Sequence, residues 1–173
     1  GGDTAADGGA VASGDVLEGA VAQERQRIEG MLERDDGVNH ADIRAEVQQT
    51  MTENVNVFRE KEGIKKALRD IREARKRYQE VAVSDPSRTY NTDLIHTIET
   101  RNVIDVAEAI AVGALVREEF RGAHWREQFQ ERRDDEWLKH TLLAWNDGSP
   151  ELYYKPVILE GEDKEYEPKE RSY

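Results

Sequence analysis

Apolar residues in the first two thirds of the chain recur at helical spacing, with charged and polar residues between them. The pattern predicts four helices, which run from about Val16 to Arg34, from Asn39 through Phe58, from Glu60 to Val81 and from Asp93 to Glu119. The second helix has the clearest stripe, because its apolar residues follow one another at intervals of four, four, four and three. The stripe consists of Ile43, Val47, Met51, Val55 and Phe58.

Capping and turn residues separate these helices. Asn39 is expected to cap the second helix, and Asn91 or Thr92 the fourth, because short polar side chains accept hydrogen bonds from free N–H groups at a helix start. Pro86 marks a turn after the third helix, since proline blocks helix continuation. Gly122 is expected to end the fourth helix by supplying a backbone angle that other residues avoid.

The last part of the chain changes period and predicts a β-hairpin. Strands are expected from Trp137 to Trp145 and from Glu151 to Leu159, joined by the five-residue loop 146–150. The fold class is therefore mostly α, an antiparallel bundle of three to four helices followed by a small C-terminal β-hairpin. The expected organisation is a flexible linker over 1–14, the helical bundle over 15–120, a turn and hairpin extension over 121–160, and an acidic, mostly disordered tail over 161–173.

Composition excludes several classes of function. The 173 residues include no cysteine, so this chain has no disulfide, no thiolate catalysis and no cysteine-ligated cluster. The net charge of -12 argues against nucleic acid as a partner, because phosphates need clustered cations. Neither a G-x-G-x-x-G nor a G-x-S-x-G motif occurs, which leaves no dinucleotide loop and no serine nucleophile elbow. Nucleophilic catalysis therefore has no support from the residues of this chain.

The acidity itself has two interpretations. It can serve solubility alone, or it can be an adaptation to high salt. Aspartate and glutamate are spread along the whole chain, and arginine outnumbers lysine by about two to one. We favour a salt-loving source, which predicts that molar KCl stabilises the fold.

The third helix also carries a run of basic residues, from Lys65 to Arg77. The run could dock an acidic partner or an anionic lipid surface. Acidic residues interleave with it throughout, so we favour a solvated face whose charges pair along the helix.

The segment 117–142 carries more side-chain chemistry than a connection between a helix and a strand needs. Its centre reads Arg121-Gly122-Ala123-His124-Trp125-Arg126. Such a cluster could hold a carboxylate or a phosphate supplied by another domain. Alternatively, these residues pin the helix end to the hairpin, with the acidic pair 134–135 as partners.

A metal site is a weaker hypothesis for the same segment. His124, His140, Asp134 and Asp135 form a conceivable ligand set, but they lack a tight ligand spacing such as H-E-x-x-H, so we expect no metal. The aromatic residues nearby either form a partner surface or fill the core between hairpin and bundle, and the sequence does not decide between the two. These are Trp125, Trp137, Trp145, Tyr153 and Tyr154.

The segment resembles the C-terminal domain of the flavoprotein subunit of succinate dehydrogenase and fumarate reductase, from about Ile43 to the end of the chain. Further similarity lies in 90–94, in Arg101-Asn102 and in the ending 171–173. The chain departs from the family pattern at Phe120, Gln128 and Gln130 and by a one-place shift of 133–135. The matching residues are Arg117, Glu119, Arg121, Gly122, Ala123, His124, Arg126, Phe129, Arg132, Asp134, Trp137, Leu138 and His140.

The resemblance implies a parent protein that oxidises succinate to fumarate with a bound FAD. Electrons then leave through the clusters of an iron–sulfur subunit to quinone. The family's catalytic groups lie upstream of Gly1, so the fragment alone is expected to be inactive. Its partners would be the flavin-binding domain of the same chain, the iron–sulfur subunit and, indirectly, the membrane anchor subunits, which place it in the cytoplasm on the inner face of the cell membrane.

The resemblance also gives the Arg-Gly-Ala-His motif a role. Arg121, Gly122, His124 and Arg126 are expected to brace the junction between the bundle and the flavin-binding domain. Two alternatives remain at this point: the C-terminal domain of an L-aspartate oxidase, which has a similar bundle, or a freestanding helical interaction module without a flavin partner.

Overall fold

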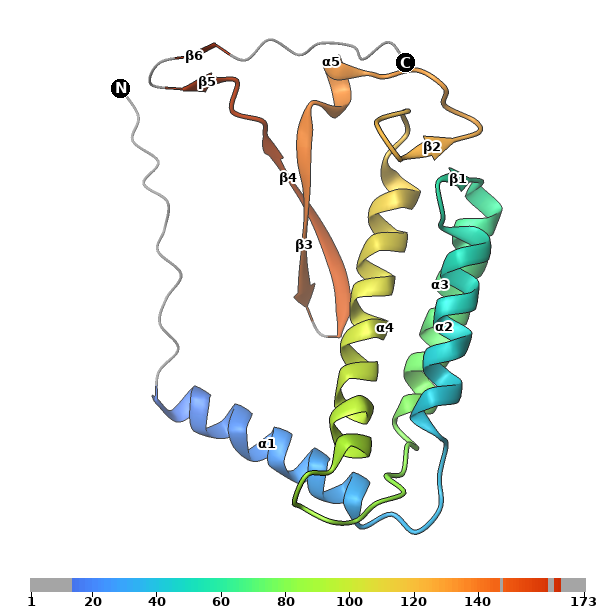
Figure 1. The fold of residues 1–173 in the computed structure, drawn as a ribbon. Helices are drawn as coiled ribbons and strands as arrows, with labels where there is room; N and C mark the ends of the chain where they lie inside the picture. Colours follow the sequence, from blue (N-terminus) through green and yellow to red (C-terminus); the bar gives the residue numbers. More distant parts are fainter. Residues whose placement is uncertain (1–13, 147, 162–163, 166–173) are drawn as a thin grey trace.

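Three helices form the body of the molecule in a computed structural model, which describes residues 14–146, 148–161 and 164–165. They are α2 (His40–Asn54), α3 (Lys61–Tyr78) and α4 (Thr92–Val116). They run side by side in alternating directions, while α1 (Gly14–Leu32) crosses the lower end (Figure 1). The predicted mostly helical class is confirmed. The linker expected over 1–14 lies almost entirely outside the described residues.

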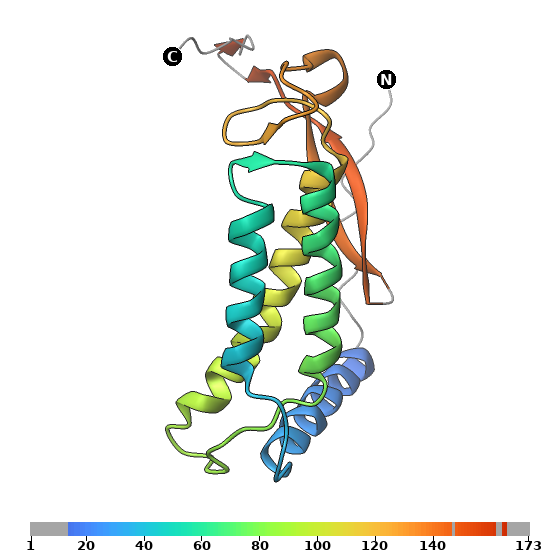
Figure 2. The same cartoon turned by 90° about the vertical axis from the view of Figure 1, so that its right-hand side faces the viewer.

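The core forms where the apolar faces of α2, α3 and α4 meet. Ile43, Ile64 and Ile71 are fully buried, and Ala107 and Ala111 let α4 approach its neighbours closely. Figure 2 shows the three helices packed together with the hairpin along one side. The amphipathic pattern of the sequence thus indicates which faces of α2 and α3 are buried.

The stripe of the second helix ends earlier than its period suggested. Helix α2 stops at Asn54, and Phe58 lies in the short strand β1 (Phe58–Arg59) with 70% of its surface exposed. The prediction for Phe58 is therefore wrong. The Arg59 Nε donates to the carbonyl of Val55 at 3.2 Å, which satisfies an acceptor at the helix end and turns the chain away.

Both predicted asparagine caps are confirmed. The Asn39 side chain accepts from the N–H of Ala41 and that of Asn91 from the N–H of Leu94, each at 2.8 Å. Cap geometry depends on a few adjacent residues, so it can be predicted locally.

Helix α1 is packed at only one end. Met31 is buried, and Arg27 donates to the Tyr78 hydroxyl at 3.2 Å, which ties this end to α3. Val16, Leu17 and Val21 near its start are more than half exposed. The apolar face of the first half of α1 is thus uncovered by the described residues.

The predicted hairpin exists, with shifted ends. Strand β3 (Lys139–Asn146) pairs with β4 (Ser149–Pro156), and Asn146 faces Ser149, so the loop has two residues rather than five. Trp137 does not begin the strand but lies in the short helix α5 (Asp134–Trp137). Strand β4 ends at Pro156, which has no N–H to donate.

The start of the acidic tail contains a further strand pair, which the sequence did not predict. Strand β5 (Glu160–Gly161) pairs with β6 (Lys164–Glu165). The remainder, 166–173, lies outside the described residues.

Charges on α3 pair as expected, with its own acidic residues and with neighbouring helices. Lys66 contacts Asp70 at 2.7 Å, and Arg72 and Arg75 reach the buried Glu108 of α4, each at 2.9 Å. The basic run is therefore largely paired. None of the helices in the described part of the chain is both long and apolar enough to span a membrane.

Candidate domain-junction site

The predicted site lies at the upper end of the bundle, between α4 and β3 (Figure 1). Helix α4 ends at Val116, so Gly122 does not end it, and that prediction is wrong. Gly122 instead lies in a tight turn closed by two hydrogen bonds of 3.0 Å between the backbones of Arg121 and His124. Its φ of 59° is a conformation that residues with a side chain rarely adopt.

A parallel strand pair joins this turn to the loop between α2 and α3. In β2 (Trp125–Arg126), Trp125 faces Phe58 and Arg126 faces Arg59. The Trp125 N–H donates to the carbonyl of Val57 at 3.2 Å. The Trp125 ring contacts those of Phe58 and Phe120 edge-on, at centroid distances of 5.8 and 5.0 Å. Two connections that are distant in sequence thus form one layer over the bundle.

Glu119 is the carboxylate at the centre of the site and is fully buried. Arg121 binds it through Nε at 2.7 Å and Nη2 at 2.9 Å, the N–H of Arg133 donates at 3.0 Å, and Arg117 also contacts it. Burial alone would raise the pKa of Glu119, but these hydrogen bonds outweigh it and the pKa is lowered. Glu119 is therefore a charged anchor that joins the segment 117–121 to Arg133.

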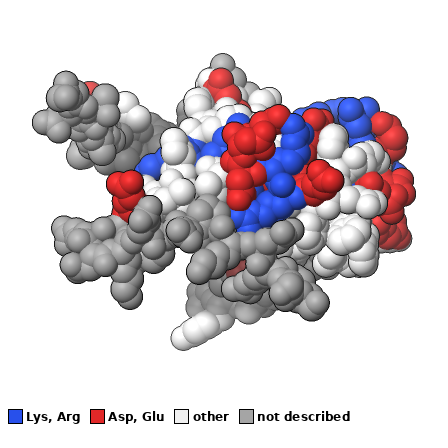
Figure 3. All heavy atoms as spheres, turned by 90° about the horizontal axis from the view of Figure 1, so that it is seen from above, with Lys and Arg blue, Asp and Glu red and all other residues white. Residues whose placement is uncertain are grey.

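Asp134 extends this network at the surface. Arg132 Nε and Arg121 Nη2 donate to it at 2.8 and 2.7 Å, and they lower its pKa to about 2. Asp134 is thus the predicted partner of Arg121. Asp135, the other expected partner, is exposed, and Arg133 pairs with Glu136 instead. From above, basic and acidic atoms interleave over this end (Figure 3).

Arg126 holds the end of α4 from inside. Its side chain is fully buried, and Nη1 donates to the carbonyls of Ala114 and Leu115 at 2.9 Å each. A cation beside the last carbonyls of a helix is stabilised by the helix dipole. Burial lowers the pKa of Arg126, and its Nε and Nη2 have no hydrogen-bond partner among the described residues. Its guanidinium lies 5.4 Å from the centre of the Phe129 ring.

His124 is held by hydrogen bonds at both ring nitrogens. Nε2 lies 2.9 Å from the carbonyl of Arg117, and Nδ1 lies 2.6 Å from Arg59 Nη1. A carbonyl only accepts, so Nε2 carries the proton and Nδ1 accepts from Arg59. Burial lowers the pKa of His124, as do the nearby charges of Arg59, Arg126 and Arg117. The geometry therefore selects the neutral ring.

Arg117 attaches the hairpin. It donates to the carbonyls of Trp137 at 3.1 Å and Lys139 at 2.8 Å, and its guanidinium lies 5.1 Å from the centre of a Trp137 ring. Trp137 is 9% exposed and belongs to the contact between hairpin and bundle, whereas Trp145 and Tyr154 are more than 40% exposed. Trp145 also contacts the bundle, because the guanidinium of Arg75 in α3 lies 4.8 Å from the centre of one of its rings. The partner surface stays a prediction.

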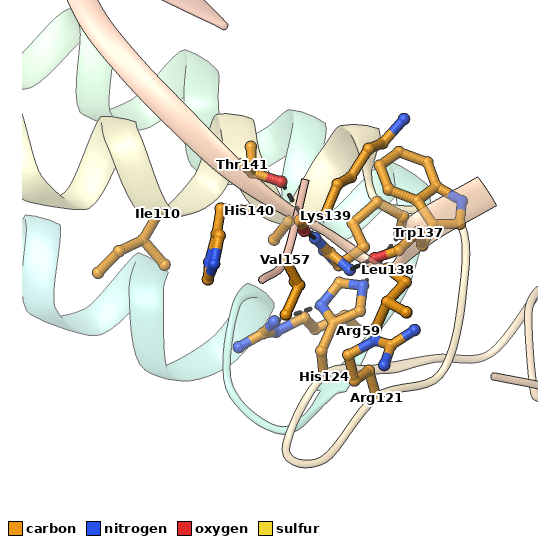
Figure 4. Close-up of a pocket in the computed structure, with 13 residues that line it drawn as sticks. Arg59, Ile110, Arg121, His124, Trp137, Leu138, Lys139, His140, Thr141 and Val157 are labelled. Atoms are coloured by element: carbon orange, nitrogen blue, oxygen red, sulfur yellow. Dashed lines mark hydrogen bonds between the residues drawn. The ribbon is translucent and has the colours of Figure 1, made fainter. Parts of the chain in front are cut away.

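An open cleft of about 480 Å³ lies between the end of α4 and the start of β3 (Figure 4). We call it the basic cleft, because its charged and titratable lining residues are all basic. In Figure 4, His140 and Ile110 lie on one side of it and Arg121 and Trp137 on the other. The basic residues are Arg59, Arg117, Arg121, His124, Lys139 and His140.

The motif residues are already held by other groups of the domain. Within the described ranges, no group of three metal-ligating side chains converges. Both ring nitrogens of His124 are engaged, Arg121 is held by two carboxylates, and Arg126 is buried against helix carbonyls. These groups build the site itself and are not arranged around a flavin phosphate.

The family model described as "Fumarate reductase flavoprotein C-term" matches residues 44–173. The chain belongs to this family. It is the C-terminal domain of a flavoprotein subunit of the succinate dehydrogenase and fumarate reductase type. The match confirms the expected extent of the resemblance, which began at about Ile43.

Relatives and solved structures agree with this assignment. The chain is 37% identical over 134 residues to the fumarate reductase flavoprotein subunit of Haemophilus influenzae, covering 77% of this chain and 22% of the relative. It is 39% identical over 134 residues to the mitochondrial succinate dehydrogenase flavoprotein subunit of Oryza sativa, covering 76% and 21%. A structure of quinol fumarate reductase from E. coli superposes with a TM-score of 0.77 at 36% identity, covering 85% and 26%. The chain thus spans about a quarter of their length.

Arg121, Gly122, His124 and Arg126 were predicted as site residues, and they do lie within one small layer. Sequence reasoning missed Arg59, which comes from another loop and has no local signal. It named Glu119 as a family match but gave it no role, because acidic pairs are common in so acidic a chain. The position of Glu119, two residues from both Arg117 and Arg121, was the sequence signal that could have predicted its ion pairs.

Proposed function

We propose that this domain supports a flavoprotein subunit that oxidises succinate to fumarate. Its parent chain would carry FAD as the electron acceptor and pass electrons to an iron–sulfur subunit and quinone. The matched relatives are named as succinate dehydrogenase and fumarate reductase flavoprotein subunits, which supports this class of reaction. The domain itself would be inactive and would lie at the inner face of the cell membrane, held there by partner subunits.

The role proposed for the domain is to brace the flavin-binding domain. The observation that carries it is the internal use of the Arg-Gly-Ala-His motif. Arg121 and Arg126 are held by groups of this domain, so they shape a rigid upper end and are not free to hold substrate. Rigid elements at a domain junction position neighbouring groups without taking part in the chemistry.

The test uses the full-length parent flavoprotein, purified in high salt and without oxygen. Succinate is added to one sample and L-aspartate to another, and the visible flavin absorption is followed. We expect succinate to bleach the flavin band. Bleaching by aspartate alone would make the parent an L-aspartate oxidase, and a protein without a flavin band would contradict the proposal.

The bracing role is tested separately in the same parent. The buried anchor is changed by Glu119→Gln, and Glu46→Gln on the exposed side of α2 is the control. We expect Glu119→Gln to lower the flavin retained per chain while turnover per bound flavin stays near the wild-type value. A fall in turnover per bound flavin would instead place this end of the domain in the chemistry.

A further inference from the structure

The basic cleft contrasts with the rest of the chain. The sequence has 37 acidic and 25 basic residues, yet none of the described residues that line this cleft is acidic. Arg59 and Lys139 contribute positive charge to it, whereas Arg117 and Arg121 are ion-paired with Glu119 and Asp134. In so acidic a molecule, a hollow with a lining of one sign attracts ligand groups of the opposite sign.

The positive charges in this region also act on one another. Burial lowers the pKa of Arg59, and the nearby Arg126 lowers it further. The ammonium of Lys139 lies 4.7 Å from the centre of a Trp137 ring and 4.1 Å from that of Tyr154. An added carboxylate would relieve this repulsion and accept hydrogen bonds from the charged donors.

An apolar groove continues from the basic cleft along the bundle. It lies between α2 and α4, has a volume of about 520 Å³ and includes Met51 and Val106 in its wall. Val106 is 57% exposed and Ile110 is 47% exposed. Ile110 lines both the groove and the basic cleft, so the two hollows adjoin at this residue.

Because the basic cleft and the apolar groove adjoin, an occupant of both must carry both anionic and apolar groups. A small anion would use the cleft and leave the apolar groove open to water. A polypeptide segment with carboxylates beside apolar side chains would cover both. The chain spans about a quarter of the length of its relatives and matches their C-terminal part, so the family places a long polypeptide before this domain.

We propose that the basic cleft and the apolar groove form one docking surface for an acidic segment of the flavin-binding part of the parent chain. The inference rests on the proposed function and adds the surface and the chemistry of contact to it. Aspartate or glutamate side chains of that segment enter beside Lys139 and Arg59, and its apolar side chains cover Ile110 and Val106.

Carbodiimide coupling tests the proposal on the full-length parent. The reagent joins an amine to a carboxylate that touches it, without a spacer, and mass spectrometry of peptides identifies the pair. We expect Lys139 to be coupled to an aspartate or glutamate upstream of this domain. Lys76 is the control, because it lies 3.3 Å from Glu73 and should couple within the domain only.

The outcome separates this proposal from the proposed function. If Lys76 couples to Glu73 while Lys139 gives no upstream product, the docking proposal is wrong. Coupling of Lys139 to the iron–sulfur subunit would also overturn it, because the cleft would then belong to a subunit interface. Flavin bleaching by succinate is read on the same preparation, so the assigned reaction can hold while the docking surface fails.

A matched pair of variants tests the apolar half. Ile110→Asp places a charge within the groove, whereas Ile95→Asp places the same charge on the same helix at a site that lines neither hollow. We expect Ile110→Asp to abolish the Lys139 product and Ile95→Asp to leave it at the wild-type yield. Equal yields in both variants would show that the groove is not covered.

Discussion

The middle of the bundle and its upper end are held together by different interactions. In the middle, buried isoleucines and alanines of α2, α3 and α4 pack against one another. At the upper end, Glu119, Arg121 and Arg126 are buried or half-buried, and charged hydrogen bonds connect three segments. Apolar packing tolerates small changes of shape, whereas a buried charge depends on every partner. The upper end should therefore be the more sensitive of the two regions.

The largest effect is expected for Glu119→Ala. It leaves Arg117 and Arg121 without their buried partner, and breaking such a pair costs about 3–5 kcal/mol of unfolding free energy. Ile71→Ala in the middle is the comparison and should cost about 2–5 kcal/mol through a cavity. Denaturant unfolding of both variants measures this. A loss below that of Ile71→Ala would remove the contrast between the regions.

Lowering the pH should destabilise the upper end of the bundle over the range in which Asp134 becomes protonated. Its pKa in the folded protein is about 2, below the ordinary 3.8, so its contribution to stability is present above pH 4 and is lost as the pH falls toward 2. The lowered pKa of Glu119 acts in the same direction. The local opening of residues 117–138, measured by backbone amide hydrogen exchange and corrected for the intrinsic pH dependence of exchange, should increase as the pH falls from 4 toward 2.

The Asp134→Asn variant is the control for this acid effect. It removes the titrating group, so the dependence of exchange on pH should become flatter while α3 behaves as in the wild type. An unchanged profile would mean that Asp134 does not hold the upper end.

A smaller effect is expected for Gly122→Ala. A side chain at φ 59° costs roughly 1–2 kcal/mol, and no atom lies within 4 Å of the added Cβ, so the cost comes from the backbone alone. Gly122→Asn should cost less, because asparagine tolerates this conformation. Thermal unfolding of the two variants distinguishes them. Equal losses would point to a collision instead.

The smallest effect on stability per residue is expected from added salt, which acts on the surface charges of both regions. We propose that the net charge of -12 reflects adaptation to high salt, so the melting temperature should rise as KCl approaches molar concentration. We expect screening to relieve the excess acidic repulsion more than it weakens exposed ion pairs such as Lys66–Asp70. A melting temperature indifferent to KCl would contradict this.

The sequence predicted best what depends on local geometry. The caps at Asn39 and Asn91 and the buried face of α3 need only neighbouring residues, and the structure confirms them. The buried face of α4 was predicted only in part, because Ile95 and Ile110 are about half exposed while Thr97 is buried. Phe58 was misplaced because an apolar residue can continue a helical period after the helix has ended. Trp137 was misplaced because α5 is a single turn with no periodic pattern of its own.

The site was predicted in part for the same reason. The motif drew attention to Arg121, His124 and Arg126, but their contacts come from Glu119 and from Arg59 of a distant loop. Gly122 has the unusual backbone angle that its type suggested, yet a two-residue turn uses it rather than a helix end. Tertiary partners decide such roles, and a local pattern does not contain them.

The parallel pairing of β1 with β2 also sets an order of assembly. Phe58 and Trp125 meet only after α3 and α4 have been synthesised and have returned the chain to the same end. Contacts between distant segments form late, because closing a long loop costs entropy before any contact repays it. During synthesis, we therefore expect α2, α3 and α4 to associate first and the layer that contains Arg59 and His124 to form after them. The layer can therefore form only when α2, α3 and α4 are already packed together.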